Sequence, residues 1–521
     1  MIDLSSYVAG KWTAGEGKTS DLVNPATEAI IARTSTAGID MGSALAYARE
    51  VGGPALRALT FAQRGEALRV ASKVVHAHRD ELIKLAIENG GNTRGDAKFD
   101  IDGAIGTLAF YGDLGVQLGA VNVLEDGESI QLGRSPRLHG AHAFVPRCGV
   151  AVHVNAFNFP AWGLAEKAAC AWLAGMPVVT KPATSTALVA WRTTQLLVDA
   201  GALPDGALSL LAGSAGDLLD RLTGQDVLAF TGSSQTGALL RGGRSVVANN
   251  VRVNVEADSL NAAVLGPDAS EGSETLNLFI GDVARDITQK TGQKCTAIRR
   301  VYVPRELVGL VVALLDERLA GVKVGNPADD GVNMGPVSTA QQLADVRAGI
   351  GRLASVGKIV RGGSGALDGV GAAPGKGFFI APTLVVSESP DVTDFAHNHE
   401  VFGPVATVMA YDGSAASAVA LVSGGGGGLV TSVYSDDKDF VRNVVLGIAP
   451  FHGRVTIGSE KIAAQAMAPG MVLPALIHGG PGRAGGGEEL GGRRGLAFYM
   501  QRVALQGDRA LLEAIVGKRP V

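Results

Sequence analysis

The chain is poor in cysteine, in net charge and in long apolar runs, and each shortage excludes a class of protein. Its three cysteines fit neither a disulfide framework nor the spacing of a metal site. A formal net charge of −4 gives no electrostatic footprint for nucleic acid or an anionic membrane. The apolar run between Lys167 and Lys181 is too short to span a bilayer, and the N-terminus lacks the pattern of a signal peptide. We therefore expect a cytoplasmic protein without a metal site that binds neither nucleic acid nor membrane.

Glycine and apolar residues are abundant instead. Apolar side chains make up 46% of the chain, and 521 residues exceed what one hydrophobic core usually supports, so two or more lobes are expected. The 72 glycines show no Gly-X-Y period, which excludes a collagen-like chain. They cluster between apolar runs and therefore predict many tight turns and close backbone approaches.

Strand-like and helix-like segments alternate through the chain. Predicted strands 150–154, 178–180, 208–211 and 227–230 are separated by predicted helices 161–173, 188–200 and 215–222. This order predicts a parallel sheet with helices on both faces, which is the outline of a dinucleotide-binding domain. A second alternating region runs from about 261 to 473, with helices predicted at 273–289 and 306–319 and a strand at 300–303. Segment 126–143 and the tail from 490 interrupt the alternation, and both could pair as strands, within the fold or across subunits.

Cys295 is the best candidate for a nucleophile. It lies in Gly292-Gln293-Lys294-Cys295-Thr296, directly after a long predicted helix. Cysteine is the side chain best suited to attack a carbonyl at neutral pH, and the small Gly292 lets the backbone approach a ligand. Cys148 and Cys170 lie in apolar strand and helix patterns, where a buried structural role is expected.

Glu256 is a candidate general base. It ends the alternating segment Arg252–Glu256, where an acidic side chain can equally be a solvated strand end. Beside a nucleophilic thiol it could take a proton from the cysteine or from water. Sequence position alone does not choose between these roles.

Several motifs together resemble the aldehyde dehydrogenase superfamily over nearly the whole chain. They are Val255-Glu256 with Cys295 thirty-nine residues later, Phe157-Asn158-Phe159-Pro160, Lys181-Pro182-Ala183, Phe230-Thr231-Gly232-Ser233 and Glu400-Val401-Phe402-Gly403-Pro404. Each motif is weak evidence alone, but all occur in the family's order and at its spacing.

The resemblance implies an α/β fold of two Rossmann-like parallel-sheet domains with a small β oligomerisation arm. Residues 1–126 and 144–262 would form the dinucleotide-binding domain and residues 263–473 the catalytic domain. Residues 127–143 and 474–521 would form the arm and the C-terminal tail. The family builds dimers or tetramers by pairing such segments, here the hairpin at 127–143 with a strand at 498–501, and we expect a homodimer.

The resemblance also implies the role of each catalytic residue. Cys295 would form a thiohemiacetal with the aldehyde, and the Asn158 amide together with the backbone N–H of Cys295 would stabilise the oxyanion. Glu256 would activate the water that hydrolyses the thioester.

A further set of residues would hold the cofactor. Glu400 and Phe402 resemble the residues around the nicotinamide ribose, and Gly232 to Gly237 would place a helix N-terminus near the diphosphate. Lys181 resembles a lysine that contacts the adenosine ribose. The complete predicted set is Phe157, Lys181, Thr184, Ser185, Gly232, Ser233, Gly237, Glu400 and Phe402. The single Gly-x-x-x-x-Gly is not the three-glycine dinucleotide fingerprint and is uninformative by itself.

The residue at position 184 predicts the cofactor. NAD-selective members of the family usually carry a glutamate there, which binds both ribose hydroxyls, whereas this chain has Thr184 followed by Ser185 and Thr186. A carboxylate would repel a 2′-phosphate, but hydroxyls and Lys181 can donate hydrogen bonds to it. The sequence therefore predicts NADP, the alternative being that Thr184 only weakens selectivity.

Two departures from the broad family pattern predict the substrate class. Ala257-Asp258 replaces a Leu-Gly pair after Glu256, which puts the local backbone geometry in doubt, and His478 to Gly492 forms an unusual glycine-rich stretch. Both features resemble a subfamily that oxidises semialdehydes made by ring opening of CoA-linked aromatics, as in aerobic benzoate or phenylacetate degradation. His478 and Arg483 become candidates near the substrate entrance, although a turn role is expected for His478 ahead of a catalytic one.

Three other functions compete with this prediction. A CoA-acylating dehydrogenase resolves the thioester with CoA, but such enzymes commonly lack the base that Glu256 supplies. A catalytically silent binding protein on the same fold would not need a complete set of nucleophile, base and oxyanion donor. A cysteine protease would need a histidine in a comparable motif, and the sequence offers none.

Overall fold

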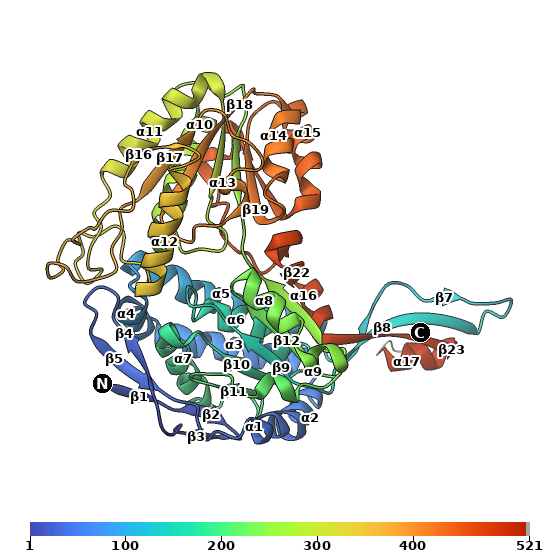
Figure 1. The fold of residues 1–521 in the computed structure, drawn as a ribbon. Helices are drawn as coiled ribbons and strands as arrows, with labels where there is room; N and C mark the ends of the chain where they lie inside the picture. The colour runs from blue at the N-terminus through green and yellow to red at the C-terminus, as the bar shows by residue number, and fades with distance from the viewer. Residues whose placement is uncertain (517–521) are drawn as a thin grey trace.

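The computed structural model describes residues 1–516, so residues 517–521 of the predicted tail lie outside the described part. Two α/β lobes lie one above the other, and a thin β arm reaches out from the lower lobe (Figure 1). Among the described residues, no helix is both long enough and apolar enough to cross a membrane.

The lower lobe is built on a seven-stranded sheet with the order β13-β12-β9-β10-β11-β2-β3. Its five parallel strands are β9 (Ala151–Val154), β10 (Val178–Lys181), β11 (Leu208–Leu210), β12 (Val227–Thr231) and β13 (Arg252–Glu256). The antiparallel edge consists of β2 (Ser6–Val8) and β3 (Lys11–Thr13). A separate small sheet is formed by β1 (Ile2–Leu4), β4 (Ser20–Val23) and β5 (Ile30–Thr34). The predicted parallel sheet is confirmed.

Helices cover both faces of this sheet because successive side chains of a strand point to opposite faces. Ala151 packs with one helix group, whereas its neighbour Val152 packs with α1 and α9 on the other face. The first group is α3 (Phe61–Ala77), α4 (Arg79–Gly90), α5 (Arg94–Leu118), α6 (Trp162–Leu173) and α7 (Ala187–Asp199). The remaining helices are α1 (Met41–Tyr47), α2 (Gly53–Arg57), α8 (Ser234–Arg241) and α9 (Arg244–Ala248).

The predicted helix at 215–222 is wrong. The segment contains only a short turn of 3-10 helix at Leu218–Arg221. Gly213 and Gly216 both have a positive φ, at 147° and 53°, and a right-handed helix cannot run through such residues. The apolar spacing of this segment serves packing against α1 instead, since Leu218 is buried beside Met41.

The upper lobe repeats the architecture with the order β16-β17-β18-β15-β14-β19-β20, in which only β16 is antiparallel to its neighbour. Its strands are β14 (Ala262–Leu265), β15 (Arg300–Pro304), β16 (Lys358–Arg361), β17 (Thr383–Ser387), β18 (Val405–Tyr411), β19 (Gly428–Tyr434) and β20 (His452–Gly458). Its helices are α10 (Glu274–Thr288), α11 (Val308–Ala320), α12 (Ala340–Leu353), α13 (Phe395–Asn398), α14 (Ala415–Ser423) and α15 (Lys438–Ile448). Ser273 caps α10 by accepting the backbone N–H of Leu276, which explains where the predicted helix begins.

The arm joins two segments that are far apart in sequence. Strand β8 (Leu138–Pro146) pairs antiparallel with β23 (Met500–Asp508), and the short strands β6 (Leu124–Glu125) and β7 (Ile130–Gln131) flank β8 (Figure 1). Helix α17 (Arg509–Ile515) follows β23. The two interrupting segments therefore do pair, but the strand expected at 498–501 begins only at Met500.

The rest of the C-terminal segment does not join the arm. Strands β21 (Ile477–Gly480) and β22 (Gly487–Leu490) form a hairpin that contacts both lobes, and α16 (Arg493–Tyr499) packs against α6. Leu490 and Leu496 belong to the main core of the lower lobe. Residues 474–499 of the predicted C-terminal tail thus bring a hairpin to the junction between the lobes.

Candidate active site

The candidate site lies where the two lobes face each other. The chain order of the lower sheet reverses between β9 and β12, and ligands of open α/β sheets bind at the carboxyl ends of strands at such a point. Asn158 follows β9, Thr231 ends β12 and Glu256 ends β13, so all three lie at this edge. Cys295 precedes β15 and reaches the same place from the amino edge of the upper sheet.

The loop that carries Cys295 has a forced backbone. Lys290, Thr291 and Gly292 have φ angles of 52°, 55° and 66°, in the left-handed region. A Cβ on Gly292 would lie 2.2 Å from the carbonyl oxygen of Gly403. Gly292 is therefore required for close approach to the 400–404 segment, not to a ligand as its position in the pentapeptide suggested.

Buried side chains fix the position of the loop that carries Cys295. The Asn261 amide donates to the carbonyl oxygens of both Cys295 and Ala297, each at 2.8 Å. Lys294 forms a fully buried ion pair with Asp286, 2.5 Å between nitrogen and oxygen. Asn261 links the loop to β19 as well, since its side-chain oxygen accepts the N–H of Val430 at 3.0 Å. These contacts fix where the sulfur of Cys295 lies.

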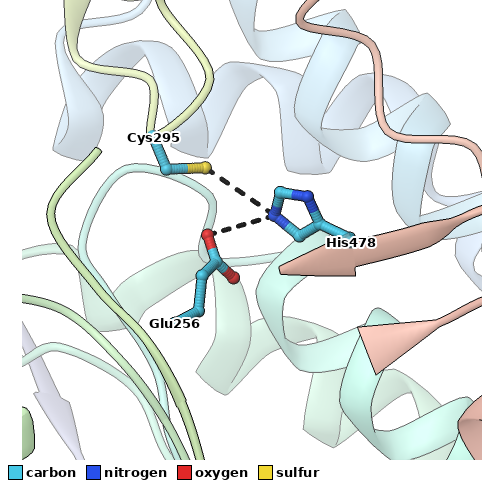
Figure 2. A group of neighbouring side chains, drawn as sticks. All are labelled: Glu256, Cys295 and His478. Atoms are coloured by element: carbon cyan, nitrogen blue, oxygen red, sulfur yellow. Dashed lines mark hydrogen bonds and ion pairs between the residues drawn. The ribbon is translucent and has the colours of Figure 1, made fainter. Parts of the chain in front are cut away.

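Cys295, Glu256 and His478 form one cluster (Figure 2). The Nε2 atom of His478 lies 3.1 Å from Oε1 of Glu256 and 3.9 Å from the Cys295 sulfur. Thr231 donates its hydroxyl to the other oxygen of Glu256 at 3.4 Å. The expectation that His478 serves as a turn residue is wrong: it lies on β21, its side chain is 3% exposed, and it faces the predicted nucleophile and base.

The cluster shifts the pKa of each member. Burial is the largest single influence on Glu256 and opposes its ionisation, but the combined effects of His478, Lys167 and the Cys295 thiol outweigh it and lower the pKa of Glu256 to about 2. For His478 burial is again the largest single influence and lowers the pKa, but Glu256 and the charge of Glu166 together overcome it and raise the pKa. Burial, followed by the charge of Glu256, raises the pKa of the Cys295 thiol well above its ordinary value. The thiol is therefore protonated at neutral pH and needs a base before it can attack.

Asn158 lies beside Cys295 and lines the cavities on both sides of it. Its side-chain nitrogen donates to the carbonyl oxygen of Gln293 at 3.1 Å, two residues before the nucleophile. An amide nitrogen carries two N–H donors, so one remains for a ligand oxygen.

A buried ionic network lies behind the cluster. Lys167 on α6 pairs with Glu166 at 3.0 Å and with Glu489 on β22 at 3.1 Å, and its side chain is 0% exposed. Asn254 donates to the remaining oxygen of Glu489 at 2.9 Å. Burial, opposed by the charge of Lys167, raises the pKa of Glu489 to about 7.

A cavity of about 270 Å³ opens from the cluster along the lower sheet. Eight predicted site residues line it: Phe157, Asn158, Gly232, Ser233, Glu256, Cys295, Glu400 and Phe402. Gly237 lets α8 pack closely on β13, because a Cβ there would lie 2.7 Å from Val255. Ser233 caps α8 by accepting the N–H of Thr236. The N-terminus of α8 therefore faces the cavity.

Asp258 already occupies part of this helix end. Its carboxylate accepts the backbone N–H of Ser234 at 3.2 Å and the Ser234 hydroxyl at 2.6 Å. Asp258 also lines the cavity, so a carboxylate lies where helix geometry favours a bound anion.

Glu400 and Phe402 form the opposite wall. Glu400 pairs with Arg299 at 3.2 Å and accepts the N–H of Ser259 at 2.9 Å. Burial raises the pKa of Glu400 to about 7 against the effect of Arg299. The rings of Phe402 and Phe157 meet edge to face, with their centroids 5.8 Å apart, and both line the cavity.

The predicted ribose-binding residues lie outside the wall of this cavity. Lys181 ends β10, and its amine donates to the carbonyl of Pro182 at 3.2 Å, while burial lowers its pKa. Thr184 and Ser185 form a short turn directly after it and are half-buried. Ala183 does line the cavity, so these residues stand next to its outer end.

A narrower cavity of about 30 Å³ lies on the other side of Cys295. Its apolar wall consists of Phe99, Phe159, Trp162 and Val472. Cys148 is exposed in the loop after β8, against the expectation of a buried strand residue, whereas Cys170 is buried in α6 as expected.

Comparison with known proteins agrees with this geometry. The model of the aldehyde dehydrogenase family matches residues 12–504. A 3,4-dehydroadipyl-CoA semialdehyde dehydrogenase from Aromatoleum evansii is 44% identical over 480 residues, which cover 92% of this chain and 93% of that protein. A solved lactaldehyde dehydrogenase superposes with a TM-score of 0.84 at 24% identity, covering 97% of this chain and 99% of that one. A betaine aldehyde dehydrogenase from Staphylococcus aureus, solved with NAD+, superposes with a TM-score of 0.85 at 22% identity, covering 99% and 96%.

Proposed function

The chain belongs to the aldehyde dehydrogenase family, and from this premise we propose that it oxidises an aldehyde to a carboxylic acid through a covalent intermediate on Cys295, with NADP as cofactor. The observation that carries the proposal is the meeting of Cys295, Glu256 and Asn158 at the inner end of the 270 Å³ cavity. These residues come from three separate segments, and each supplies one requirement of acyl chemistry: a nucleophile, a base and an oxyanion donor.

In the first step the sulfur of Cys295 forms a bond to the aldehyde carbon, and the carbonyl π electrons move to oxygen. The free N–H of Asn158 and the backbone N–H of Cys295 donate to that oxyanion. One such donor is worth roughly 3–4 kcal/mol in other acyl-transfer enzymes. The resulting thiohemiacetal would become a thioester by loss of hydride from its carbon, and a nicotinamide cofactor held by Glu400 and Phe402 would supply the hydride acceptor.

In the second step Glu256 takes a proton from water, and the hydroxide attacks the thioester carbonyl. The C–S bond breaks, the carboxylic acid leaves, and the thiolate of Cys295 is regenerated, while Glu256 releases the proton it took from water to solvent. A carboxylate with a pKa of about 2 is a weak base, so its position beside the acyl carbon, not its basicity, has to provide the rate.

The lining of the cavity supports binding of the nicotinamide and diphosphate part of a dinucleotide. The capped N-terminus of α8 would hold the diphosphate, and Glu400 with Phe402 would hold the nicotinamide ribose and its surroundings. Lys181, Thr184 and Ser185 would hold the adenosine ribose with its 2′-phosphate. Comparing kcat/KM for NADP and NAD tests this assignment. A preference for NAD would overturn it.

The preferred substrate in this proposal is a CoA-linked semialdehyde from aromatic ring cleavage, as in benzoate degradation. The 44% identity to a dehydrogenase of such a compound supports it. Turnover of short aliphatic, aromatic and CoA-linked semialdehydes with NADP is the test. A preference for simple aldehydes would remove the substrate assignment and leave the reaction intact.

Two other functions on this fold can be distinguished from the proposed one, the first by its reaction product and the second by the behaviour of a Cys295 variant. A CoA-acylating enzyme would release no free acid without added CoA, and the buried Glu256 beside Cys295 favours hydrolysis. A catalytically silent protein would bind cofactor equally well with Cys295→Ala and turn over no aldehyde in either form.

The assembly and the compartment complete the proposal. The arm formed by β8 and β23 extends away from both lobes, which supports a homodimer in which it packs on a second copy (Figure 1). Sedimentation of the intact chain tests that state. Three free cysteines support a reducing, cytoplasmic setting.

A further inference from the structure

We propose that His478 is a catalytic residue that takes the proton from the Cys295 thiol, an inference that rests on the proposed function and deepens it. Its Nε2 atom stands between the two other members of the cluster, 3.9 Å from the sulfur and 3.1 Å from the Glu256 carboxylate (Figure 2). One nitrogen therefore faces both a proton source and a charge that stabilises the protonated ring.

The backbone around His478 fixes the ring in this place. His478 pairs with Glu489 across the β21–β22 hairpin. A Cβ on the next residue, Gly479, would lie 2.0 Å from the carbonyl oxygen of Gly487, and one on Gly480 would lie 2.3 Å from that of Gly428. The two glycines after His478 thus let the strand approach its neighbours, and the imidazole is held without a flexible loop.

The charges around His478 favour proton uptake. Glu256 lies on β13, Glu166 on α6 and Glu489 on β22, and all three are acidic. Arg454 on β20 and Lys167 on α6 oppose them, and Lys167 is already paired with two carboxylates. The net effect raises the pKa of His478 above its ordinary value, whereas Glu256 has become the weaker base.

The proposed proton transfer balances as follows. Nε2 of neutral His478 accepts the proton of the Cys295 S–H bond, and the electron pair of that bond stays on sulfur. That pair forms the new C–S bond to the aldehyde carbon, while the carbonyl π pair becomes the oxyanion. When the thioester is hydrolysed and the C–S bond breaks, the proton returns from Nε2 to the leaving thiolate. Because His478 handles the thiol proton, Glu256 needs to act only on the hydrolytic water.

Alkylation of Cys295 by iodoacetamide tests this without substrate or cofactor. The parent for the test carries Cys148→Ser, because Cys148 is the exposed thiol, whereas Cys170 is buried. The rate is measured from pH 5.5 to 10 in that parent, in His478→Gln and in His142→Gln. His142 is an exposed histidine on the arm and serves as the matched control.

We expect an inflection in the parent and in the His142 control at the pH where His478 loses its proton, because only the neutral imidazole can accept the thiol proton. In His478→Gln this base is absent, and the rate at pH 7 should fall by about tenfold or more, because burial and the charge of Glu256 hold the pKa of the thiol above its ordinary value and each unit of that rise lowers the thiolate fraction tenfold. Equal rates and equal profiles in the parent and His478→Gln would overturn the proposal. So would a parent whose rate rises steadily through pH 9, a result that needs no folded variant.

Turnover is measured on the same proteins. A parent that shows the alkylation inflection but oxidises no aldehyde contradicts the proposed function and leaves the Cys295–His478 pair supported. An active parent without the inflection contradicts the role of His478 alone.

Discussion

Replacing Lys167 by methionine should destabilise the lower lobe strongly, and more so as pH rises. The Lys167 amine is fully buried and pairs with Glu166 and Glu489, whose side chains are 11% and 6% exposed. Removing one partner of a buried ion pair costs about 3–5 kcal/mol, because the remaining charge is left without compensation. For a lobe of this size we expect the melting temperature to fall by on the order of 10 °C.

The pH dependence follows from Glu489. Burial already raises its pKa from 4.5 to about 7, and loss of the Lys167 charge, which opposes that rise, would raise it further. A group whose folded pKa is raised stabilises the fold at low pH and loses that contribution as pH rises through the folded value. The Lys167→Met variant can keep Glu489 protonated at pH 6 but less so at pH 8. The difference from the parent should therefore widen between pH 6 and pH 8.

Thermal unfolding followed by circular dichroism is the assay. Lys73→Met is the matched control, because Lys73 is an exposed lysine on α3. The double variant Lys167→Met/Glu489→Gln should recover part of the loss, since it removes a buried charge. A melting temperature of Lys167→Met within about 2 °C of the parent at both pH values would refute the reasoning.

Three further substitutions test the site. Glu256→Gln should keep acylation but lower steady-state turnover by about 10²–10⁴-fold. The reaction should then show a burst of NADPH followed by a slow phase. Equal loss of the burst and of the steady-state rate would contradict a role of Glu256 in hydrolysis. Asp258→Asn removes a carboxylate from the N-terminus of α8 and should lower the Kd of the cofactor several-fold, a gain of about 1 kcal/mol in binding free energy. Titration calorimetry measures this Kd. Weaker binding would show that Asp258 aids cofactor binding. Gly292→Ala should abolish activity, because the new Cβ would lie 2.2 Å from the carbonyl oxygen of Gly403 and the φ of residue 292 is 66°. Gly281→Ala is the control, since a methyl group there has no atom within 4 Å. An active Gly292→Ala enzyme would contradict the packing of the loop.

Regular elements were predictable because their signals are local. The helix at 273–289 has a serine cap and an amphipathic pattern, and the strands at 178–180 and 227–230 are continuous apolar runs between turn residues. The predicted helix at 215–222 failed for a reason that composition hides. Gly216 adopts a left-handed backbone conformation, and the sequence alone does not show which glycines have a positive φ.

The role of His478 could not be predicted in the same way, although the departure of its segment from the family pattern made it a candidate near the substrate entrance. The run His478-Gly479-Gly480-Pro481 has the composition of a turn, yet the glycines serve close strand packing and the histidine faces inward. Its partners Glu256 and Cys295 lie about two hundred residues earlier in the chain. The buried ion pair of Lys167 could not be predicted either. Its partner Glu489 lies on β22, far along the chain, and only the fold brings the two side chains together. The one sequence signal for either was its departure from its surroundings: a charged residue in an apolar run, and a histidine in a glycine-rich one.

If Cys295 carries the acyl group, the covalent adduct on its sulfur can be trapped and weighed. Glu256→Gln enzyme, slowed in hydrolysis, is mixed with an aldehyde and NADP, quenched in acid, and measured by intact-protein and peptide mass spectrometry. The account predicts a mass increase equal to the aldehyde less two hydrogens, located on the peptide with Cys295 and absent when Cys295→Ala is added. NADPH formation with no adduct on Cys295, or with an adduct on another residue, would contradict it.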